Sequence, residues 1–150
     1  MQTAKLYETH LKTNHLEKAI EFYKSLGFTL AYVIEERRVA FFYLGDVSQK
    51  ENMLGIWETE GDVPKRHIAF TITTDELKSS IQWLSERGIA AEEDFGLPPI
   101  EPIVHSWMPA ASVYFRDPDG NSLEYIALLD GPPHPELGVI YLSKWESLNK

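Results

Sequence analysis

Residues 9–28 read THLKTNHLEKAIEFYKSLGF, and a similar stretch, HIAFTITTDELKSSIQWLSERGI, follows at residues 67–89. In each stretch a short β-like run that contains a histidine precedes an amphipathic helix, and the helix ends at a glycine. A shift of 61 residues superposes four pairs: Leu16 and Leu77, Ile20 and Ile81, Phe22 and Trp83, and Gly27 and Gly88. The chain is therefore predicted to contain two copies of one module.

Each predicted helix is followed by further strand candidates, which gives the order βαβββ twice. The candidates are residues 28–35, 39–44 and 53–58 in the first module, and a poorly defined run near 90–93, then 112–116 and 122–128, in the second. The sequence Asp117-Pro118-Asp119-Gly120 is typical of a tight turn between the last two. We expect an α+β fold in one domain, residues 1–129, with modules at about 5–60 and 66–129.

Two segments depart from this pattern. Residues 92–111 contain four prolines, and a loop of this length is usually functional or partly disordered. Residues 130–150 form a turn-rich tail that ends in a predicted short helix at residues 141–149.

Composition excludes several classes of protein. The 150 residues include 14 Lys+Arg and 23 Asp+Glu, a formal net charge of −9, and no cysteine. Without cysteine there are no disulfides and no thiolate metal ligands, so any metal must be held by His, Asp or Glu. The acidic balance argues against nucleic-acid binding, and no apolar run approaches the ~20 residues of a membrane span. We expect a soluble, cytoplasmic protein with no membrane partner.

Three residues are candidate metal ligands. His10 and His67 occupy similar places in the two modules, so pairing of the modules about a pseudo-twofold axis would direct both toward one cavity. Glu124 lies in an otherwise apolar strand, where a carboxylate is costly to bury unless a positive group meets it. A divalent cation bound by two imidazoles and this carboxylate would meet that requirement.

Four segments carry a resemblance to a known family: Thr9-His10-Leu11, residues 22–28 at the end of the first helix, Arg66-His67-Ile68-Ala69-Phe70, and residues 114–124. Over about residues 5–129 the chain resembles the vicinal oxygen chelate superfamily, which includes glyoxalases, bleomycin resistance proteins and extradiol dioxygenases. The resemblance implies paired βαβββ modules that form an open, U-shaped, eight-stranded barrel around a divalent metal. It also implies His10, His67 and Glu124 as the ligands.

One position departs from a branch of the family. Glyoxalase I-type members carry a further carboxylate or Gln ligand on the fourth strand of the first module, where this chain has Gly55. Three protein ligands fit the fosfomycin-resistance and extradiol dioxygenase branches at least as well. In a fosfomycin-hydrolysing branch a Glu at the start of the third strand acts as base, and Val39 stands there in this chain. This chain therefore lacks one residue expected for the glyoxalase I reaction and one expected for fosfomycin hydrolysis.

Two His and one carboxylate with open positions suit Zn²⁺, Ni²⁺, Mn²⁺ or Fe²⁺. Such an ion acts as a Lewis acid on a small, oxygen-rich substrate. We rank a lactoylglutathione-lyase-like reaction first, fosfomycin-type thiol transfer or hydrolysis second, and ring-cleaving dioxygenation third. Lys12, which shares the strand face of His10, and His105, in the proline-rich loop, are the candidate catalytic residues: Lys12 for a substrate anion, His105 for proton relay or pocket lining.

A non-catalytic function is the alternative from a different class. Bleomycin-resistance-like proteins sequester a cationic drug between two acidic chains, and the charge of −9 modestly favours this reading. The complete His/His/Glu set counts against it. The family resemblance further implies a homodimer in which His10 of one chain joins His67 and Glu124 of the other.

Overall fold

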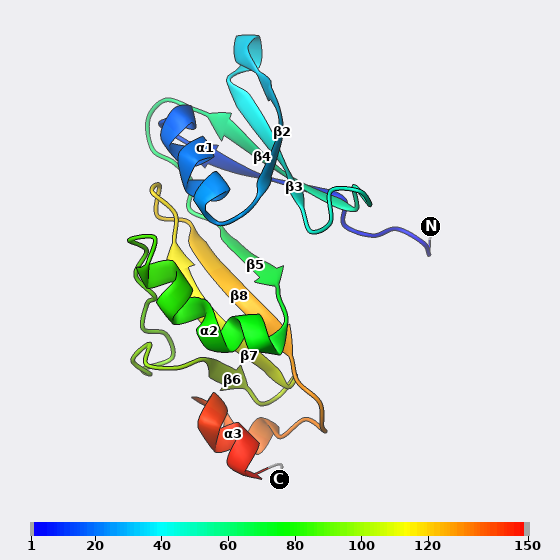
Figure 1. Cartoon of the computed structure of the whole chain (residues 1–150), viewed down its shortest axis with the longest axis vertical. Helices are drawn as coiled ribbons and strands as arrows, with labels where there is room; N and C mark the ends of the chain where they lie inside the picture. The colour runs from blue at the N-terminus through cyan, green and yellow to red at the C-terminus, as the bar shows by residue number, and fades with distance from the viewer. Residues whose placement is uncertain (1, 149–150) are drawn as a thin grey trace. The chain divides into compact units, whose positions relative to one another are not determined.

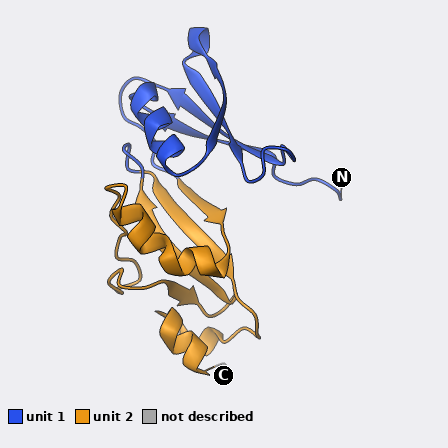
Figure 2. Cartoon of the chain, in the orientation of Figure 1, with its two compact units in different colours: residues 1–66, 117–120 blue, residues 67–116, 121–150 orange. Residues whose placement is uncertain are grey.

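The computed structural model describes residues 2–148, which form two compact units (Figure 2). Unit 1 is Met1–Arg66 together with the short segment Asp117–Gly120, and unit 2 is His67–Arg116 together with Asn121–Lys150. Each unit has one sheet, of four strands in unit 1 and five in unit 2, with an α-helix against it (Figure 1). The α+β class and the two-module pattern are confirmed, while closure of the sheets into a barrel stays a prediction.

Unit 1 has a mixed sheet in the order β1-β4-β3-β2. Its elements are β1 (Glu8–Thr13), α1 (Leu16–Ser25), β2 (Thr29–Ile34), the 3-10 helix η1 (Glu35–Arg37), β3 (Val39–Leu44) and β4 (Asn52–Glu58). Strands β1 and β4 pair in parallel, and the other neighbours are antiparallel. The apolar stripe of α1 is buried as its 3.6-residue spacing predicts, through Leu16, Ala19 and Tyr23.

The two faces of the unit 1 sheet differ in character. Leu54, Ile56 and Phe42 are at most 1% exposed and belong to the core on which α1 packs. Since side chains alternate along a strand, the other face carries His10 and, on β4, Gly55 and Trp57. This second face bears the candidate ligand of unit 1.

Unit 2 has a sheet in the order β5-β8-β7-β6-β9. Its elements are β5 (His67–Thr71), α2 (Thr74–Ser85), β6 (Ile103–His105), β7 (Ala110–Arg116), β8 (Ser122–Leu128), the 3-10 helix η2 (Pro135–Leu137), β9 (Val139–Tyr141) and α3 (Leu142–Leu148). Helix α2 begins with a capping box, in which Thr73 and Glu76 bond to each other's backbone N–H. Strands β5 and β8 are parallel, as β1 and β4 are in unit 1.

Two expectations for unit 2 need correction. The run near residues 90–93 is not a strand and makes one isolated bridge, between Glu92 and Tyr114. The strand lies instead at Ile103–His105, inside the proline-rich loop, because Ile103 and Val104 are good strand formers and pair with both β7 and β9. Strand β9, in the tail, gives nine strands among residues 2–148 rather than the eight expected.

The predicted terminal helix at residues 141–149 corresponds to α3, and its last predicted residue, Asn149, lies outside the described residues. Among residues 2–148, no helix has the length and apolar character needed to cross a bilayer.

Candidate metal centre

The strand register of unit 2 places a group of polar side chains on one face of its sheet. His67 pairs with Ser122, and Glu124 pairs with Tyr114 on the neighbouring strand β7. Ser112 lies two residues before Tyr114 and therefore on the same face. The opposite face carries Leu123 and Tyr125, which are buried. Five polar residues from three strands thus share one side of this sheet.

His67 and Glu124 form a direct pair. Nε2 of His67 lies 3.0 Å from Oε2 of Glu124. The Glu124 side chain is only 6% exposed, and its Oε1 accepts a hydrogen bond from the Ser112 hydroxyl. Nδ1 of His67 lies 3.1 Å from the Ser122 hydroxyl, which can either donate a hydrogen bond to it or accept one from it. With its proton on Nε2, His67 donates to Glu124. With the proton on Nδ1, the Nε2 lone pair would be free for an ion shared with Glu124.

This pair fits a divalent metal. Two ligand atoms each about 2.1 Å from one ion lie about 3.0 Å apart at an octahedral angle and about 3.4 Å apart at a tetrahedral one. The 3.0 Å between Nε2 and Oε2 is the length of an ordinary hydrogen bond and is also compatible with a shared ion. A buried carboxylate held by a serine and a histidine oriented by a second serine are the supporting contacts that metal ligands usually have. Within either unit, no third His, Asp or Glu of residues 2–148 joins the pair in a metal-binding group.

His105 is connected to this group through Tyr114. Its Nε2 lies 2.8 Å from the Tyr114 hydroxyl, and its side chain is buried, with the exposed Phe95 packed edge-on against its ring. Burial, followed by the charge of Glu124, raises the pKa of Tyr114 above its usual value, so the phenol stays protonated. Tyr114 and Ser112 also line a small open hollow together with Glu92, Asp94 and Glu101. Tyr114 thus lies between His105 and the predicted ligand Glu124: it contacts the first and pairs with the second across the sheet.

His10 lies in unit 1, where both ring nitrogens have partners. Nδ1 accepts a hydrogen bond from the Trp57 indole N–H over 2.6 Å, and Nε2 lies 2.7 Å from Oε1 of Glu8. Since an indole N–H can only donate, the proton of the neutral ring is on Nε2 and is donated to Glu8. Metal binding through Nε2 would require the other neutral tautomer, with the proton on Nδ1, so the hydrogen bond from Trp57 would have to break. The structure joins His67 and Glu124, and the trio with His10 stays a prediction.

Gly55 leaves no room for a side chain beside His10. A Cβ built at this position would lie 2.5 Å from Nδ1 of His10 and 3.2 Å from Cε1 of Phe41. A carboxylate or Gln ligand at residue 55 would therefore displace the imidazole. The packing around His10 is therefore consistent with the absence of a ligand side chain at Gly55.

Sequence reasoning missed Ser112 and Tyr114, and it considered Trp57 only as a possible hydrophobic wall for a substrate, not as a partner of His10. The alternation Ser112-Val113-Tyr114 on a predicted strand was an available signal, because it places two polar side chains on one face. Trp57 had no such signal, since its contact with His10 depends on the register between β1 and β4.

The comparisons with known proteins concern the family and the fold. The model of the Glyoxalase/Bleomycin resistance protein/Dioxygenase superfamily matches residues 5–125. The chain is 28% identical over 119 residues to the metallothiol transferase FosB of Staphylococcus saprophyticus, covering 73% of this chain and 67% of that protein.

Two solved structures share the fold. An integron cassette protein from the mobile metagenome of the Halifax Harbour sewage outfall is 30% identical, with a TM-score of 0.70, over 83% of this chain and 98% of that one. The fosfomycin resistance protein FosX of Listeria monocytogenes, solved with Mn(II) and sulfate, is 19% identical, with a TM-score of 0.62, over 86% of this chain and 93% of that one. The chain therefore belongs to the glyoxalase/bleomycin resistance/dioxygenase superfamily.

Proposed function

We propose that this protein is a divalent-metal-dependent enzyme that acts on a small, oxygen-rich substrate. His67 and Glu124 would supply two ligands, and His10 would supply the third in the tautomer that carries its proton on Nδ1. The observation that carries the proposal is the buried Glu124 carboxylate, which faces Nε2 of His67 at 3.0 Å and is held by Ser112. A carboxylate this buried requires compensation, and a neutral imidazole alone compensates it poorly.

The chain's own residues would prepare the site for chemistry. The bound ion would supply Lewis acidity toward a substrate oxygen. Ser112 fixes the orientation of Glu124, and the Ser122 hydroxyl can accept a hydrogen bond from Nδ1 of His67, which would leave Nε2 free for the ion. The protonated Tyr114 hydroxyl is available as a hydrogen-bond donor on the same face, with His105 behind it.

Among the possible reactions, we place thiol transfer first. The similarity to a metallothiol transferase supports this choice, and the lack of space at Gly55 counts against the four-ligand site of glyoxalase I-type enzymes. In such a transfer the thiol sulfur bonds to an electrophilic carbon, a C–O bond breaks, and the released oxygen takes up a proton. The lactoylglutathione-lyase-like reaction, which the sequence alone ranked first, now comes second, and the dioxygenase-like reaction stays third.

Metal content tests the site directly. We expect elemental analysis of protein purified without chelators to find close to one transition-metal ion per chain, and His67→Ala to remove it. His15→Ala is the matched control, because His15 is exposed at the start of α1 and should leave the metal content unchanged. Full metal occupancy in both His10→Ala and His67→Ala would reject the assignment.

Activity assays then separate the reactions. We expect the metal-loaded protein to consume fosfomycin in the presence of a low-molecular-weight thiol, with the adduct detected by mass spectrometry. The hemithioacetal of methylglyoxal and glutathione is assayed in parallel. Turnover of the hemithioacetal alone would reverse our ranking, and no turnover of either at full metal occupancy would favour the sequestration alternative.

A homodimer remains part of the proposal, with His10 reaching the other two ligands across the two chains. Light scattering tests this, and a monomer that still binds one metal per chain through all three residues would contradict the shared site.

A further inference from the structure

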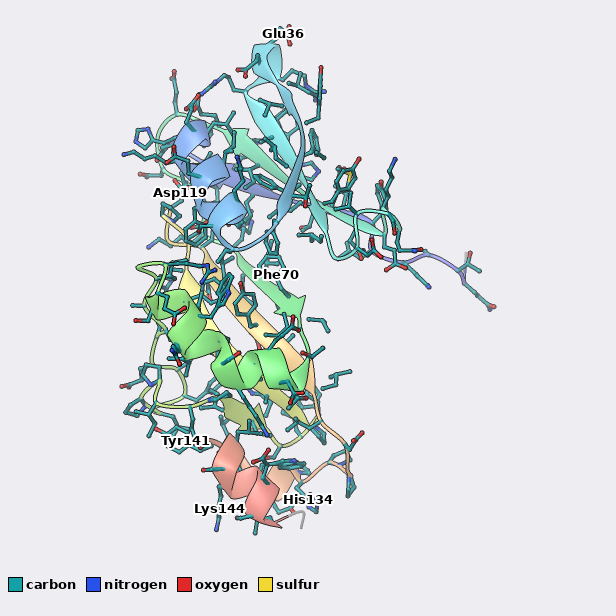
Figure 3. The ribbon with its side chains drawn as sticks, in the orientation of Figure 1. Glu36, Phe70, Asp119, His134, Tyr141 and Lys144 are labelled. Carbon is teal, nitrogen blue, oxygen red and sulfur yellow. The ribbon has the colours of Figure 1, made fainter. Side chains whose placement is uncertain are left out.

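The turn between β2 and β3 is held in place by Arg38. This residue has a left-handed backbone, φ 49°, and its guanidinium donates to both carboxylate oxygens of Glu58, at 2.9 and 2.8 Å. It also donates to Glu17 at 2.6 Å. Glu36 marks the tip of this turn in Figure 3. The turn is therefore tied to the end of β4 and to α1 rather than left to move freely.

The anchored turn carries Arg37 to the face of Trp57. The Arg37 guanidinium carbon lies 4.8 Å from the centre of the indole ring, and the Lys12 ammonium lies 5.4 Å from it. The Trp57 N–H is bonded to His10, which fixes the ring within the sheet face. Two cations on separate segments thus each lie within 5.4 Å of the centre of one aromatic ring, which is bonded to His10.

Among residues 2–148, neither Lys12 nor Arg37 forms an ion pair with a carboxylate. Arg38, Lys78 and Arg116, in contrast, each do. A cation–π contact uses none of the guanidinium N–H groups, so these donors stay available for an oxyanion. In a chain of net charge −9, a local positive site favours the approach of an anion.

We propose that Lys12, Arg37 and Trp57 form an anion-binding subsite on the His10 face of unit 1. Its ligand is a small phosphonate, phosphate or carboxylate group: the guanidinium donates in bidentate fashion and the ammonium supplies a second positive charge. As a substrate-binding element this inference rests on the proposed function, and there it would hold the anionic end of the substrate near His10. Glu8, the nearest acidic group on that strand face, is engaged by His10.

The test follows the Trp57 indole N–H by NMR with a chelator present, so that it does not depend on the metal. Trp57→Phe identifies the signal among the four tryptophans. At constant ionic strength the protein is titrated with inorganic phosphate, methylphosphonate and acetate. We expect a saturable shift of this signal with at least one probe, and the tightest of the three identifies the group recognised.

The variants decide whether the named residues bind the anion. Arg37→Ala and Lys12→Ala should each weaken the saturable binding by about ten-fold, the effect of losing one charge-assisted hydrogen bond. Lys18→Ala and Lys24→Ala, which remove the same charge from exposed positions on α1, should leave it unchanged. The inference is overturned if no probe gives a saturable shift, or if the Lys12→Ala/Arg37→Ala double variant binds as the unmodified protein does. Binding without metal uptake would reject the metal site and leave this subsite standing.

Discussion

The Tyr23 hydroxyl donates a hydrogen bond of 2.7 Å to Oδ2 of Asp117, joining helix α1 to the turn between β7 and β8. Both side chains are buried, and burial, followed by the charge of Asp117, raises the pKa of Tyr23 above its usual value. This bond holds the Asp117–Gly120 segment within unit 1 although its flanking strands belong to unit 2.

Tyr23→Phe should therefore destabilise the fold. A buried hydrogen bond to a charged acceptor contributes about 1.5–3 kcal/mol, so we expect a loss of that size in the free energy of unfolding measured with urea. Tyr7→Phe is the control, since Tyr7 is 53% exposed and its loss of a hydroxyl should be nearly neutral. Equal effects of the two changes would show that the Tyr23 bond contributes little.

Gly55→Ala should disturb His10 specifically. The added Cβ would lie 2.5 Å from Nδ1, so the imidazole must turn and its bond from Trp57 must break. We expect a destabilisation of about 1–3 kcal/mol in urea unfolding. In a His10→Ala background the obstructing ring is gone, and the same glycine change should cost markedly less. An unchanged cost in that background would place the clash elsewhere, for example at Phe41.

Glu58 should make stability depend on acid pH. Its hydrogen bonds with the Arg38 side chain and then with the Leu16 backbone N–H lower its pKa from 4.5 to about 2. Since the folded-state pKa lies below the usual value, this carboxylate stabilises the fold above pH 4.5, and the stabilisation is lost as the pH falls toward 2. Between pH 5 and pH 2.5, the free energy of unfolding measured with urea should fall more for the natural chain than for Glu58→Gln. Glu21→Gln, on an exposed position of α1, should follow the natural chain.

Replacing either of two buried serines of unit 2 with alanine should have different effects: loss of metal affinity at Ser112 and a gain of stability at Ser106. Ser112→Ala removes the donor to Oε1 of Glu124, and loss of such a supporting contact typically weakens metal affinity by about 10–100-fold. Ser106 is fully buried, and its hydroxyl finds no partner among residues 2–148. Ser106→Ala should therefore keep the metal and raise the stability, because a buried polar group without a bond is costly. Isothermal titration with Zn²⁺ and urea unfolding measure the two effects, and a stability loss in Ser106→Ala would point to a water-mediated bond.

The sequence predicts most of the strands and helices because their signals are local. The apolar spacing of α1 and α2, their terminal glycines and the Asp117–Gly120 turn all depend on neighbours within a few residues. Strands β6 and β9 contain three residues each, too few to show an alternating pattern. They form because each pairs along its length with another segment, and that pairing is invisible in the linear sequence.

In the candidate site, too, the sequence reveals the features that depend on neighbouring residues and not those that depend on contacts between strands. Glu124 stands out in the sequence as a carboxylate in an apolar strand, and the structure confirms that it is buried and faces His67. The contacts that decide what His10 can do come from Glu8, two residues away, and from Trp57, across the sheet. Only the first of these shares a strand with His10, so spacing alone could not reveal that both its nitrogens are engaged.

Parallel pairing of β1 with β4 and of β5 with β8 has a consequence for synthesis on the ribosome. Each sheet joins its first strand to its fourth in chain order, so neither sheet can be completed until most of its module has been made. The hydrogen bond from Tyr23 forms later still, because its acceptor, Asp117, is synthesised 94 residues after it. Since non-local contacts of this kind form slowly, the N-terminal module is expected to leave the exit tunnel incomplete and to finish folding only when the second module arrives.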